Sequence, residues 1–375
     1  MYENEQEVIE ILKRHKIDVV STLPCEKIGT LLQLVATERA FCHVGMNREE
    51  NGVGVSAGVY IANGKPLMII QSTGLGNSIN AIMSLTVTYK LPLPIIASWR
   101  GIYKEKIAAQ EPLGKAMPKL LDALGLKYTL IDAPTAIGLI EDVIQDAFAN
   151  ERPHIALISP KTWESEARNE VLHQKCSRSY DLNYKTEFRA PEMRRYEAIK
   201  IIAEYLKEEA VISNIGVPSK ELYAAKDRDL NFYMLGSLGQ ASPIGLGVAL
   251  KTQRETIVLD GDGSLQMSNI LPIVADKKPA NFTIVCLDNG TWGSTGDQPT
   301  PYADMDLTAM GAGVENTEKV QTKEELLYRL EHLYDGPGPR FLHVMVKPGN
   351  VPAVANINLR AEELKSRFRA AITYR

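Results

Sequence analysis

The sequence predicts an α/β protein made of two doubly wound parallel sheets, one in each half of the chain. Short apolar runs without alternation, such as 66–71 and 282–288, are typical of strands buried on both faces of a parallel sheet. Helical patterns separate these runs, as in βαβ units. The length of 375 residues, at roughly 150 residues per domain, indicates two or three domains.

The first half begins with a helix. Val8, Ile11 and Leu12 share one helical face, and the pattern ends near His15. The strands that follow are expected at 19–23, 66–71, 93–98 and 154–159, with helices around 31–35, 76–88, 115–124 and 135–149.

The second half repeats this alternation. Helices are expected at 192–208, 239–250, 264–275 and 322–334, and strands at 211–213, 256–260, 282–288 and 341–346. The polar stretch between the halves has no sustained apolar period, which is typical of an interdomain connection. We therefore expect a domain at 1–165, a linker at 166–191 and a domain at 192–375.

The composition excludes several classes of protein. With 42 basic and 46 acidic residues the net charge is −4, so we expect no nucleic-acid partner. No apolar run approaches the ~18 residues that span a bilayer, and the acidic, polar N-terminus is unlike a signal peptide. The four cysteines include no CxxC pair, so we expect reduced thiols and a cytoplasmic protein without a membrane partner.

One motif carries chemistry. The predicted strand 256–260 leads directly into Gly261-Asp262-Gly263-Ser264, which places Asp262 at the carboxyl end of a parallel strand, where open α/β sheets bind ligands. The amides of Gly263 and Ser264 begin a helix, which favours a phosphate. Asn289 follows the next strand, so both side chains reach the same sheet edge. Their oxygens, with phosphate oxygens, suit Mg²⁺.

A simpler interpretation is available for each half of this motif. A GDG sequence alone is more often only a strand–helix turn, and an Asn after a strand often only starts the next turn. The pairing of Asp262 with Asn289, one strand–helix–strand unit later, favours the ligand interpretation.

The segment 261–291 resembles the metal–diphosphate signature of thiamine diphosphate enzymes, a GDG followed about 25 residues later by Asn. The resemblance implies thiamine diphosphate as cofactor and Mg²⁺ bound by the side chains of Asp262 and Asn289 and the carbonyl of Thr291. Many members carry Asn-Asn at the end of the motif, whereas this chain has Asp288-Asn289.

The segment 234–250 is similar to the GSxG segment of the same family. By this likeness the Gly236 carbonyl meets the 4′-amino group of the cofactor, and Leu238 is the apolar wedge that bends it. A helix start packed closely on the sheet explains the same residues. Further cofactor contacts implied by the resemblance are those of Gly216, Ser219, Ser237, Gly261, Gly263 and Ser264.

The catalytic acid of the family is a glutamate that contacts the pyrimidine ring. The segment 47–66 resembles its setting, and alignment on Gly58 places the acid at Glu49, with Glu50 as the neighbouring alternative. A Glu at a helix N-terminus otherwise simply complements the helix dipole. A carboxyl in an apolar crevice favours its protonated form and can share a proton with the ring nitrogen N1′.

Four stretches resemble the sulfopyruvate decarboxylases, with the alpha and beta subunits fused and no middle domain: 21–32, 71–84, 98–117 and 289–300. The resemblance implies decarboxylation of 3-sulfopyruvate to sulfoacetaldehyde and CO₂, in coenzyme M biosynthesis. A phosphonopyruvate or other 2-oxo acid decarboxylase is the first alternative. A non-catalytic protein that keeps the fold is the second.

Both candidate substrates carry a strong anion beside the reacting carbonyl, for which a guanidinium is a natural partner. Arg100, after the strand 93–98, is the candidate, and Lys106, Gln110 and Asn77 are further candidates for the substrate pocket. For the lysine, a solvated loop charge is an equally good interpretation. The resemblance also implies a homodimer or homotetramer with sites at the subunit interface.

Overall fold

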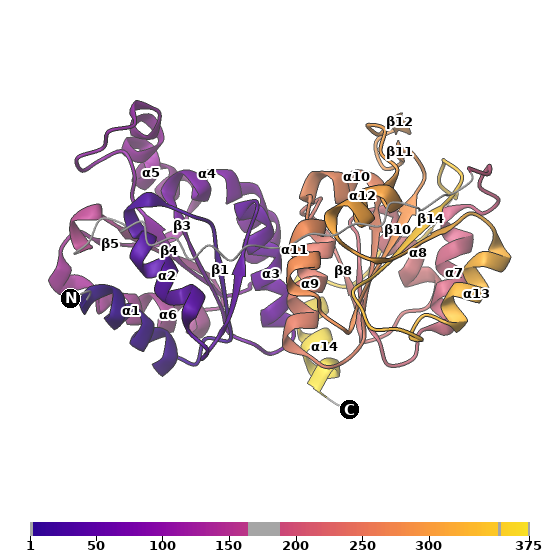
Figure 1. Ribbon diagram of the computed structural model, residues 1–375, viewed down its shortest axis with the longest axis horizontal. Helices are drawn as coiled ribbons and strands as arrows, with labels where there is room; N and C mark the ends of the chain where they lie inside the picture. The colour runs from indigo at the N-terminus through magenta and orange to yellow at the C-terminus, as the bar shows by residue number, and fades with distance from the viewer. Residues whose placement is uncertain (1–2, 164–187, 352–353, 374–375) are drawn as a thin grey trace.

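The structure of the protein, a computed structural model, describes residues 3–163, 188–351 and 354–373. It contains two α/β domains side by side, each built on a parallel sheet of six strands (Figure 1). The expected fold class is therefore confirmed. Most of the predicted linker, 166–187, lies outside the described residues, so the predicted domain boundaries stay a prediction.

The first sheet has the order β2-β1-β3-β4-β6-β5, and every pair in it is parallel. Its strands are β1 (Val19–Thr22), β2 (Cys42–Gly45), β3 (Pro66–Gln71), β4 (Leu93–Ser98), β5 (Lys127–Ile131) and β6 (Pro153–Ile158). The helices around it are α1 (Glu3–Arg14), α2 (Gly29–Thr37), α3 (Glu49–Ile61), α4 (Ser72–Ala81), α5 (Glu111–Leu124) and α6 (Leu139–Ala149).

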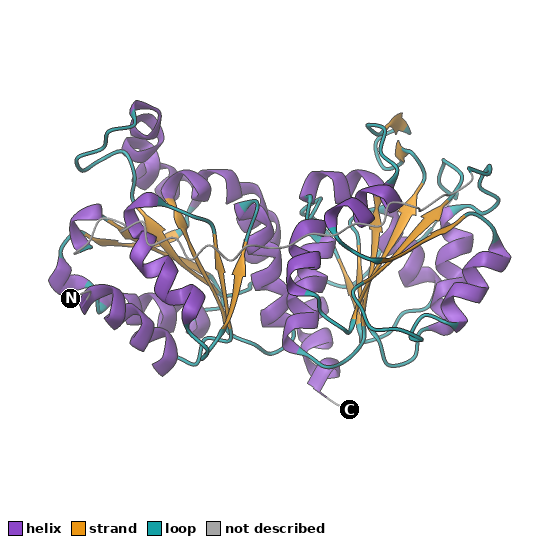
Figure 2. Ribbon diagram, viewed as in Figure 1, coloured by secondary structure: helices purple, strands orange, loops and turns teal. Residues whose placement is uncertain are grey.

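The second sheet has the order β13-β14-β10-β9-β7-β8. Its strands are β7 (Ala210–Ser213), β8 (Asn231–Tyr233), β9 (Thr256–Gly261), β10 (Phe282–Asp288), β13 (Asn316–Val320) and β14 (Arg340–Met345). Counted within each domain, both sheets have the order 2-1-3-4-6-5. The strands of both sheets run toward the same side of the molecule (Figure 2), so their carboxyl edges share that side.

The helices of the second domain are α7 (Arg195–Tyr205), α8 (Val217–Ala225), α9 (Ala241–Lys251), α10 (Asp262–Ser268), α11 (Leu271–Lys277), α12 (Met305–Ala312), α13 (Lys323–Glu331) and α14 (Ala361–Thr373). A small hairpin of β11 (Thr291–Trp292) and β12 (Gln298–Pro299) projects beyond the sheet. No helix in the described part of the chain is long and apolar enough to cross a bilayer.

All eight predicted strands are confirmed, but the four edge strands β2, β5, β8 and β13 were not predicted. The single helix expected at 264–275 is wrong. The chain forms α10 and α11 instead, because Asn269 adopts a left-handed conformation with φ of 47° and ends α10. Pro272 then lies in the first turn of α11, where a missing N–H costs nothing.

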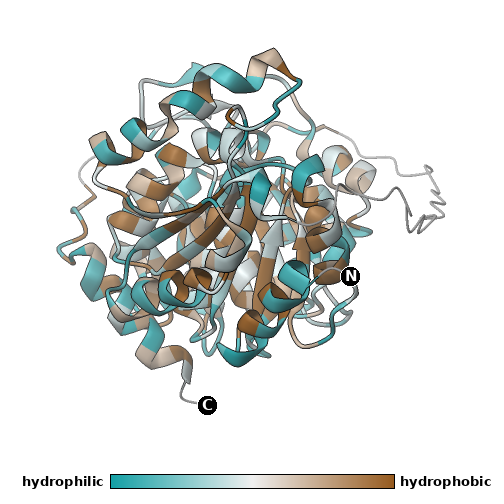
Figure 3. Ribbon diagram, turned by 90° about the vertical axis from the view of Figure 1, so that its left-hand side faces the viewer, coloured by the Kyte–Doolittle hydropathy of each residue, from teal (hydrophilic) through white to brown (hydrophobic). Residues whose placement is uncertain are grey.

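The strands are built largely of hydrophobic residues, whereas the outer helices carry both hydrophilic and hydrophobic residues (Figure 3). One apolar core is continuous from the first domain into the second, since α3 and α9 cross in close contact between the sheets. A Cβ at Gly58 of α3 would clash with the Ile244 carbonyl, and one at Gly247 of α9 would clash with the Val55 carbonyl. The two helix backbones thus touch directly, which only glycine permits.

We expect Gly247→Ala to lower the free energy of unfolding by about 1–3 kcal/mol, because the new methyl must push the helix backbones apart. Urea denaturation measures the change. Gly138→Ala is the matched control, since no atom lies within 4 Å of a Cβ there, and its effect is expected to stay within about 0.5 kcal/mol. Equal stability of Gly247→Ala and wild type would contradict the close helix contact.

Candidate active site

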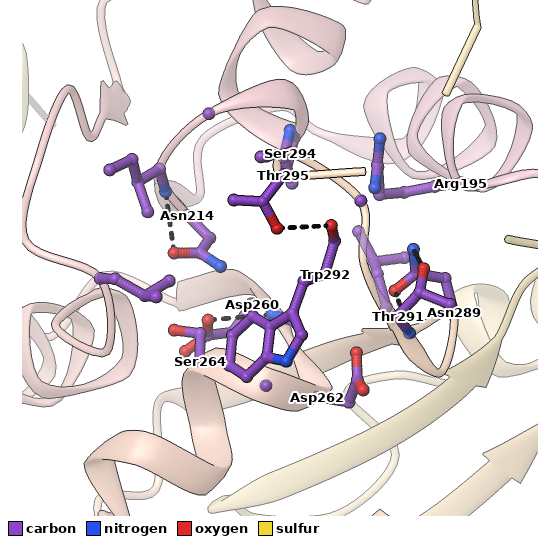
Figure 4. A pocket seen from close by; sticks show the side chains of 18 residues that line it. Arg195, Asn214, Asp260, Asp262, Ser264, Asn289, Thr291, Trp292, Ser294 and Thr295 are labelled. Atoms are coloured by element: carbon purple, nitrogen blue, oxygen red, sulfur yellow. Dashed lines mark hydrogen bonds between the residues drawn. The ribbon is translucent and has the colours of Figure 1, made fainter. Parts of the chain in front are cut away.

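A cavity of about 290 Å³ opens at the carboxyl edge of the second sheet (Figure 4). The loops after β7, β9 and β10 line it. Strand order reverses between β7 and β9, which makes this the topological switch point where doubly wound sheets bind ligands. Of the predicted residues, the structure brings Gly216, Leu238, Gly261, Asp262, Gly263, Ser264, Asn289 and Thr291 together in this cavity.

Asp262 supplies the main charge of the cavity. Its side chain is buried, and its Oδ2 accepts a hydrogen bond from Thr300 Oγ1 at 2.6 Å. Burial, and then the negative charge of Asp288, raise the pKa of Asp262 to about 6. A buried carboxyl that is held in a negative field, and to which none of the described cationic side chains is bonded, is a suitable place for a bound cation.

The turn after β10 places the other predicted metal ligands. Asn289 Nδ2 donates to Thr291 Oγ1 at 2.9 Å, and the Thr291 hydroxyl donates to Asp297 at 2.9 Å. Within the described residues no group of three His, Cys, Asp or Glu side chains could hold a metal. A cation here would therefore rely on Asp262, amide and carbonyl oxygens, which is the donor set that Mg²⁺ prefers.

Two glycines shape the cavity wall. Gly216 has a φ of 84°, and a Cβ there would lie 2.8 Å from Ser294 Oγ. A Cβ at Gly263 would lie 2.5 Å from the indole of Trp292, which stands over the start of α10 (Figure 4). These positions therefore admit only a bare backbone, and α8 and α10 both start at the cavity with their amide groups.

The GSxG segment lies between the domains. A Cβ at Gly236 would be 3.1 Å from the Ser84 carbonyl, and the Ser237 hydroxyl is 2.5 Å from the Ser84 hydroxyl. Leu238 is 37% exposed and lines the cavity, as a wedge against a ligand requires. Ser219 is different, because its buried hydroxyl lies 2.7 Å from the Asn214 carbonyl and helps to shape the loop.

Ten of the residues that line the cavity were not predicted, and the polar or aromatic side chains of Arg195, Asn214 and Trp292 are among them. Arg195 is bonded to Glu221 at 2.7 Å and to Asn350 at 2.6 Å, so it places a fixed positive charge at the cavity. The pairing of Arg195 with Glu221 crosses 26 positions and has no local sequence signal. Trp292 directly follows Thr291, so its position beside the motif could have indicated that it lines the cavity.

Glu49 lies at the start of α3, in a separate small cavity that it shares with Glu50 and Asn77. Its side chain is 6% exposed, and Asn77 Nδ2 lies 3.4 Å from its Oε2. Glu50 forms an ion pair with Arg48, whereas none of the described ion pairs includes Glu49. Of the two neighbouring glutamates, Glu49 is thus the buried one outside the described ion pairs, and Glu50 is the one whose charge is paired.

The predicted substrate residues are only partly brought together. Arg100 is 3% exposed and makes a two-pronged ion pair with Glu105, with both N–O distances at 2.8 Å. Gln110 accepts from Thr73 at 3.0 Å, and Lys106 is exposed. Neither Arg100 nor Lys106 lines the Glu49 cavity or the Asp262 cavity. The charge of Arg100 is thus already balanced within the chain.

Family comparisons agree with this geometry. Residues 4–125 match the thiamine pyrophosphate enzyme, N-terminal TPP binding domain, and residues 220–344 match the C-terminal TPP binding domain. The chain belongs to the thiamine pyrophosphate enzymes. The cofactor expected from the sequence is therefore confirmed, and the two family models that match are the N-terminal and C-terminal cofactor-binding domains, without a middle domain.

Curated relatives cover the full length. The sulfopyruvate decarboxylase of Methanosarcina acetivorans is 47% identical over 98% of this chain and 97% of its own. The phosphonopyruvate decarboxylase of Streptomyces viridochromogenes is 31% identical over 95% of this chain and 92% of its own. Separate beta and alpha subunits of sulfopyruvate decarboxylases match 47% of the chain at 45% identity and 40% of it at 38% identity. The expected fusion of two subunits is thus confirmed.

Among solved structures, a benzoylformate decarboxylase from Polynucleobacter necessarius superposes with a TM-score of 0.72. It covers 93% of this chain and 99% of its own at 12% sequence identity, which supports the fold alone.

The Arg100–Glu105 pair makes a pH-dependent contribution to stability. Hydrogen bonds from Arg100 lower the pKa of Glu105 from 4.5 to about 2. The stabilisation, about 3 kcal/mol at most, is present above pH 4.5 and is lost as the pH falls toward 2. We expect Glu105→Gln to be less stable than wild type at pH 7, with a difference that shrinks at pH 3, in urea denaturation.

Glu111→Gln is the control for this measurement, because Glu111 makes only an exposed ion pair with Lys115. Its difference from wild type is expected to be small at both pH values. A Glu105→Gln difference that is the same at pH 3 and pH 7 would contradict the role given to the carboxylate.

Proposed function

We propose that the protein decarboxylates 3-sulfopyruvate to sulfoacetaldehyde and CO₂ with thiamine diphosphate and Mg²⁺. The observation that carries this proposal is the buried Asp262 carboxyl at a switch-point cavity, beside Asn289 and within a family of thiamine pyrophosphate enzymes. The 47% identity to a sulfopyruvate decarboxylase over nearly the whole chain supports the choice of substrate.

Each predicted residue then has a separate task. Asp262, Asn289 and the Thr291 carbonyl hold the metal and, through it, the diphosphate. Leu238 supports the bent form of the cofactor. Glu49, which is buried at the start of α3, would contact the pyrimidine nitrogen of the cofactor and exchange a proton with it. Thiamine diphosphate, when bound, supplies the nucleophilic carbon and the electron sink for decarboxylation.

Phosphonopyruvate is the second candidate substrate, because a phosphonopyruvate decarboxylase is 31% identical over 95% of the chain. Both substrates present an anion one carbon from the carbonyl group that reacts. With Arg100 paired to Glu105, Lys106 is the predicted substrate residue whose charge is free to meet that anion, since it is exposed and forms none of the described ion pairs.

The protein is further proposed to act as a homodimer or homotetramer. Glu49 and Asp262 line two different cavities of one chain, which supports a site completed by a second copy. In such an assembly Glu49 of one chain faces the Asp262 cavity of its neighbour.

The experiment is CO₂ release from sulfopyruvate and from phosphonopyruvate, with thiamine diphosphate and Mg²⁺ added. We expect a larger kcat/KM for sulfopyruvate than for phosphonopyruvate. Turnover of phosphonopyruvate alone would overturn the substrate choice.

Replacing the acid tests its role. We expect Glu49→Gln to lose at least about 100-fold in kcat, because glutamine cannot carry the proton, while thiamine diphosphate affinity in calorimetry stays within a few-fold. Glu50→Gln is the matched control and is expected to retain most of its activity. A fully active Glu49→Gln enzyme would refute the assignment.

A further inference from the structure

A chain of buried charges lies directly behind the turn that carries Asn289 and Thr291. His343 of β14 is 1% exposed, and its Nε2 lies 2.7 Å from Asp288 Oδ2. Its Nδ1 lies 2.8 Å from Asp306 Oδ1, at the start of α12. Lys319 of β13 closes the chain at 3.2 Å from Asp306.

The partners of the imidazole ring favour its protonated form. Both ring nitrogens face carboxylate oxygens, and an ionised carboxylate can only accept a hydrogen bond. Hydrogen bonds from His343 and the charge of Lys319 outweigh burial and hold the pKa of Asp306 down to about 2, so Asp306 is ionised. The Asp306 amide also lies near Nδ1, but at 3.3 Å it is farther away than the carboxylate. Carboxylate oxygens at 2.7 and 2.8 Å from the two ring nitrogens suit an imidazolium that donates in both directions, and these contacts outweigh burial and raise the pKa of His343.

Asp288 fixes the turn that carries Asn289 and Thr291, because each of its carboxylate oxygens makes a separate bond. Its Oδ1 accepts from the amide of Gly290 at 2.9 Å, while its Oδ2 is bonded to His343. Its carbonyl accepts from the amide of Val346 at 2.8 Å, just beyond β14. Both carboxylate oxygens of Asp288, the residue that precedes Asn289, are thus bonded within the protein.

We propose that His343 is a positioning residue for the metal site: it holds the Asp288 carboxylate in the turn, away from the cation, so that Asn289 and Thr291 face Asp262. This inference rests on the proposed function, because it takes Asp262, Asn289 and Thr291 as the metal ligands. It also explains how the chain accommodates the charge of Asp288 one residue before Asn289. This negative charge is balanced from behind by the imidazolium.

The test is the affinity for Mg²⁺ at saturating thiamine diphosphate, measured by calorimetry on the full-length protein. We expect His343→Gln to weaken Mg²⁺ binding by about tenfold or more, as changes to groups behind metal ligands commonly do. Charge alone predicts the opposite sign. Removing a positive charge near the site would tighten the binding of a cation, so weaker binding identifies positioning as the cause.

A matched control lies in the first domain. His154 is also buried, with Nδ1 2.7 Å from Asp146 and Nε2 2.9 Å from Thr129. We expect His154→Gln to lower thermal stability and to leave the Mg²⁺ affinity unchanged. A general loss of buried histidine bonding is thereby separated from an effect on the metal site.

A rescue variant sharpens the test. The double variant Asp288→Asn with His343→Gln has the same net charge as wild type, and the new amide can still accept from Gly290. We expect it to recover most of the lost Mg²⁺ affinity. Failure of this recovery, or Mg²⁺ binding by His343→Gln that equals or exceeds wild type, would overturn the positioning role.

Two measurements on the wild-type protein complete the test. Absence of Mg²⁺-dependent cofactor binding in the wild type would overturn the proposed function and the inference together. If His343→Gln does not fold, ¹⁵N spectra of the wild-type histidines at pH 8 decide instead. We expect one imidazole protonated on both nitrogens and slow to exchange, and a spectrum without such a ring would overturn the inference.

Discussion

The constraint on which the site depends is the negative charge at the ends of two neighbouring strands. Asp262 directly follows β9 and Asp288 ends β10, and burial together with the charge of Asp288 raises the pKa of Asp262. Within the described structure His343 balances Asp288, while no cationic side chain bonds to Asp262. A divalent cation bound at Asp262 would remove this imbalance, so folding of the second domain prepares the proposed metal site.

The second feature is the shared plan of the two domains. Both sheets have the same strand order and present their carboxyl edges on one side. Glycine contacts between α3 and α9 bring the two sheets close together, and α3 begins at Glu49. The residue proposed to carry a proton and the residue proposed to hold the metal therefore belong to equivalent edges of two similar domains, which meet at the crossing of α3 and α9.

Burial explains how far the fold could be predicted from the sequence. The eight predicted strands are the interior strands, which are buried on both faces and read as continuous apolar runs. The four missed strands are the sheet edges, and three of them, β2, β5 and β13, are partly exposed along their length, while β8 has only three residues. The break between α10 and α11 depends on the left-handed backbone of Asn269, for which a helical pattern carries no signal.

The site shows the same division. Asp262, Asn289 and Glu49 lie in motifs that are compact in sequence, so they could be predicted, and their roles remain to be tested. Arg195 is held at the cavity by Glu221, which lies far from it in the sequence. The charge of Arg100 is neutralised by Glu105 only because the loop between them folds back. Such long-range pairings are set by tertiary packing, which local patterns do not encode.

The most direct measurement mixes two inactive variants, Glu49→Gln and Asp262→Asn, after subunit exchange. If each site combines Glu49 of one chain with Asp262 of its neighbour, a mixed dimer contains one intact site, and about a quarter of wild-type activity should return at equal mixing. Sites completed within single chains would give no recovery, and that result would contradict the account.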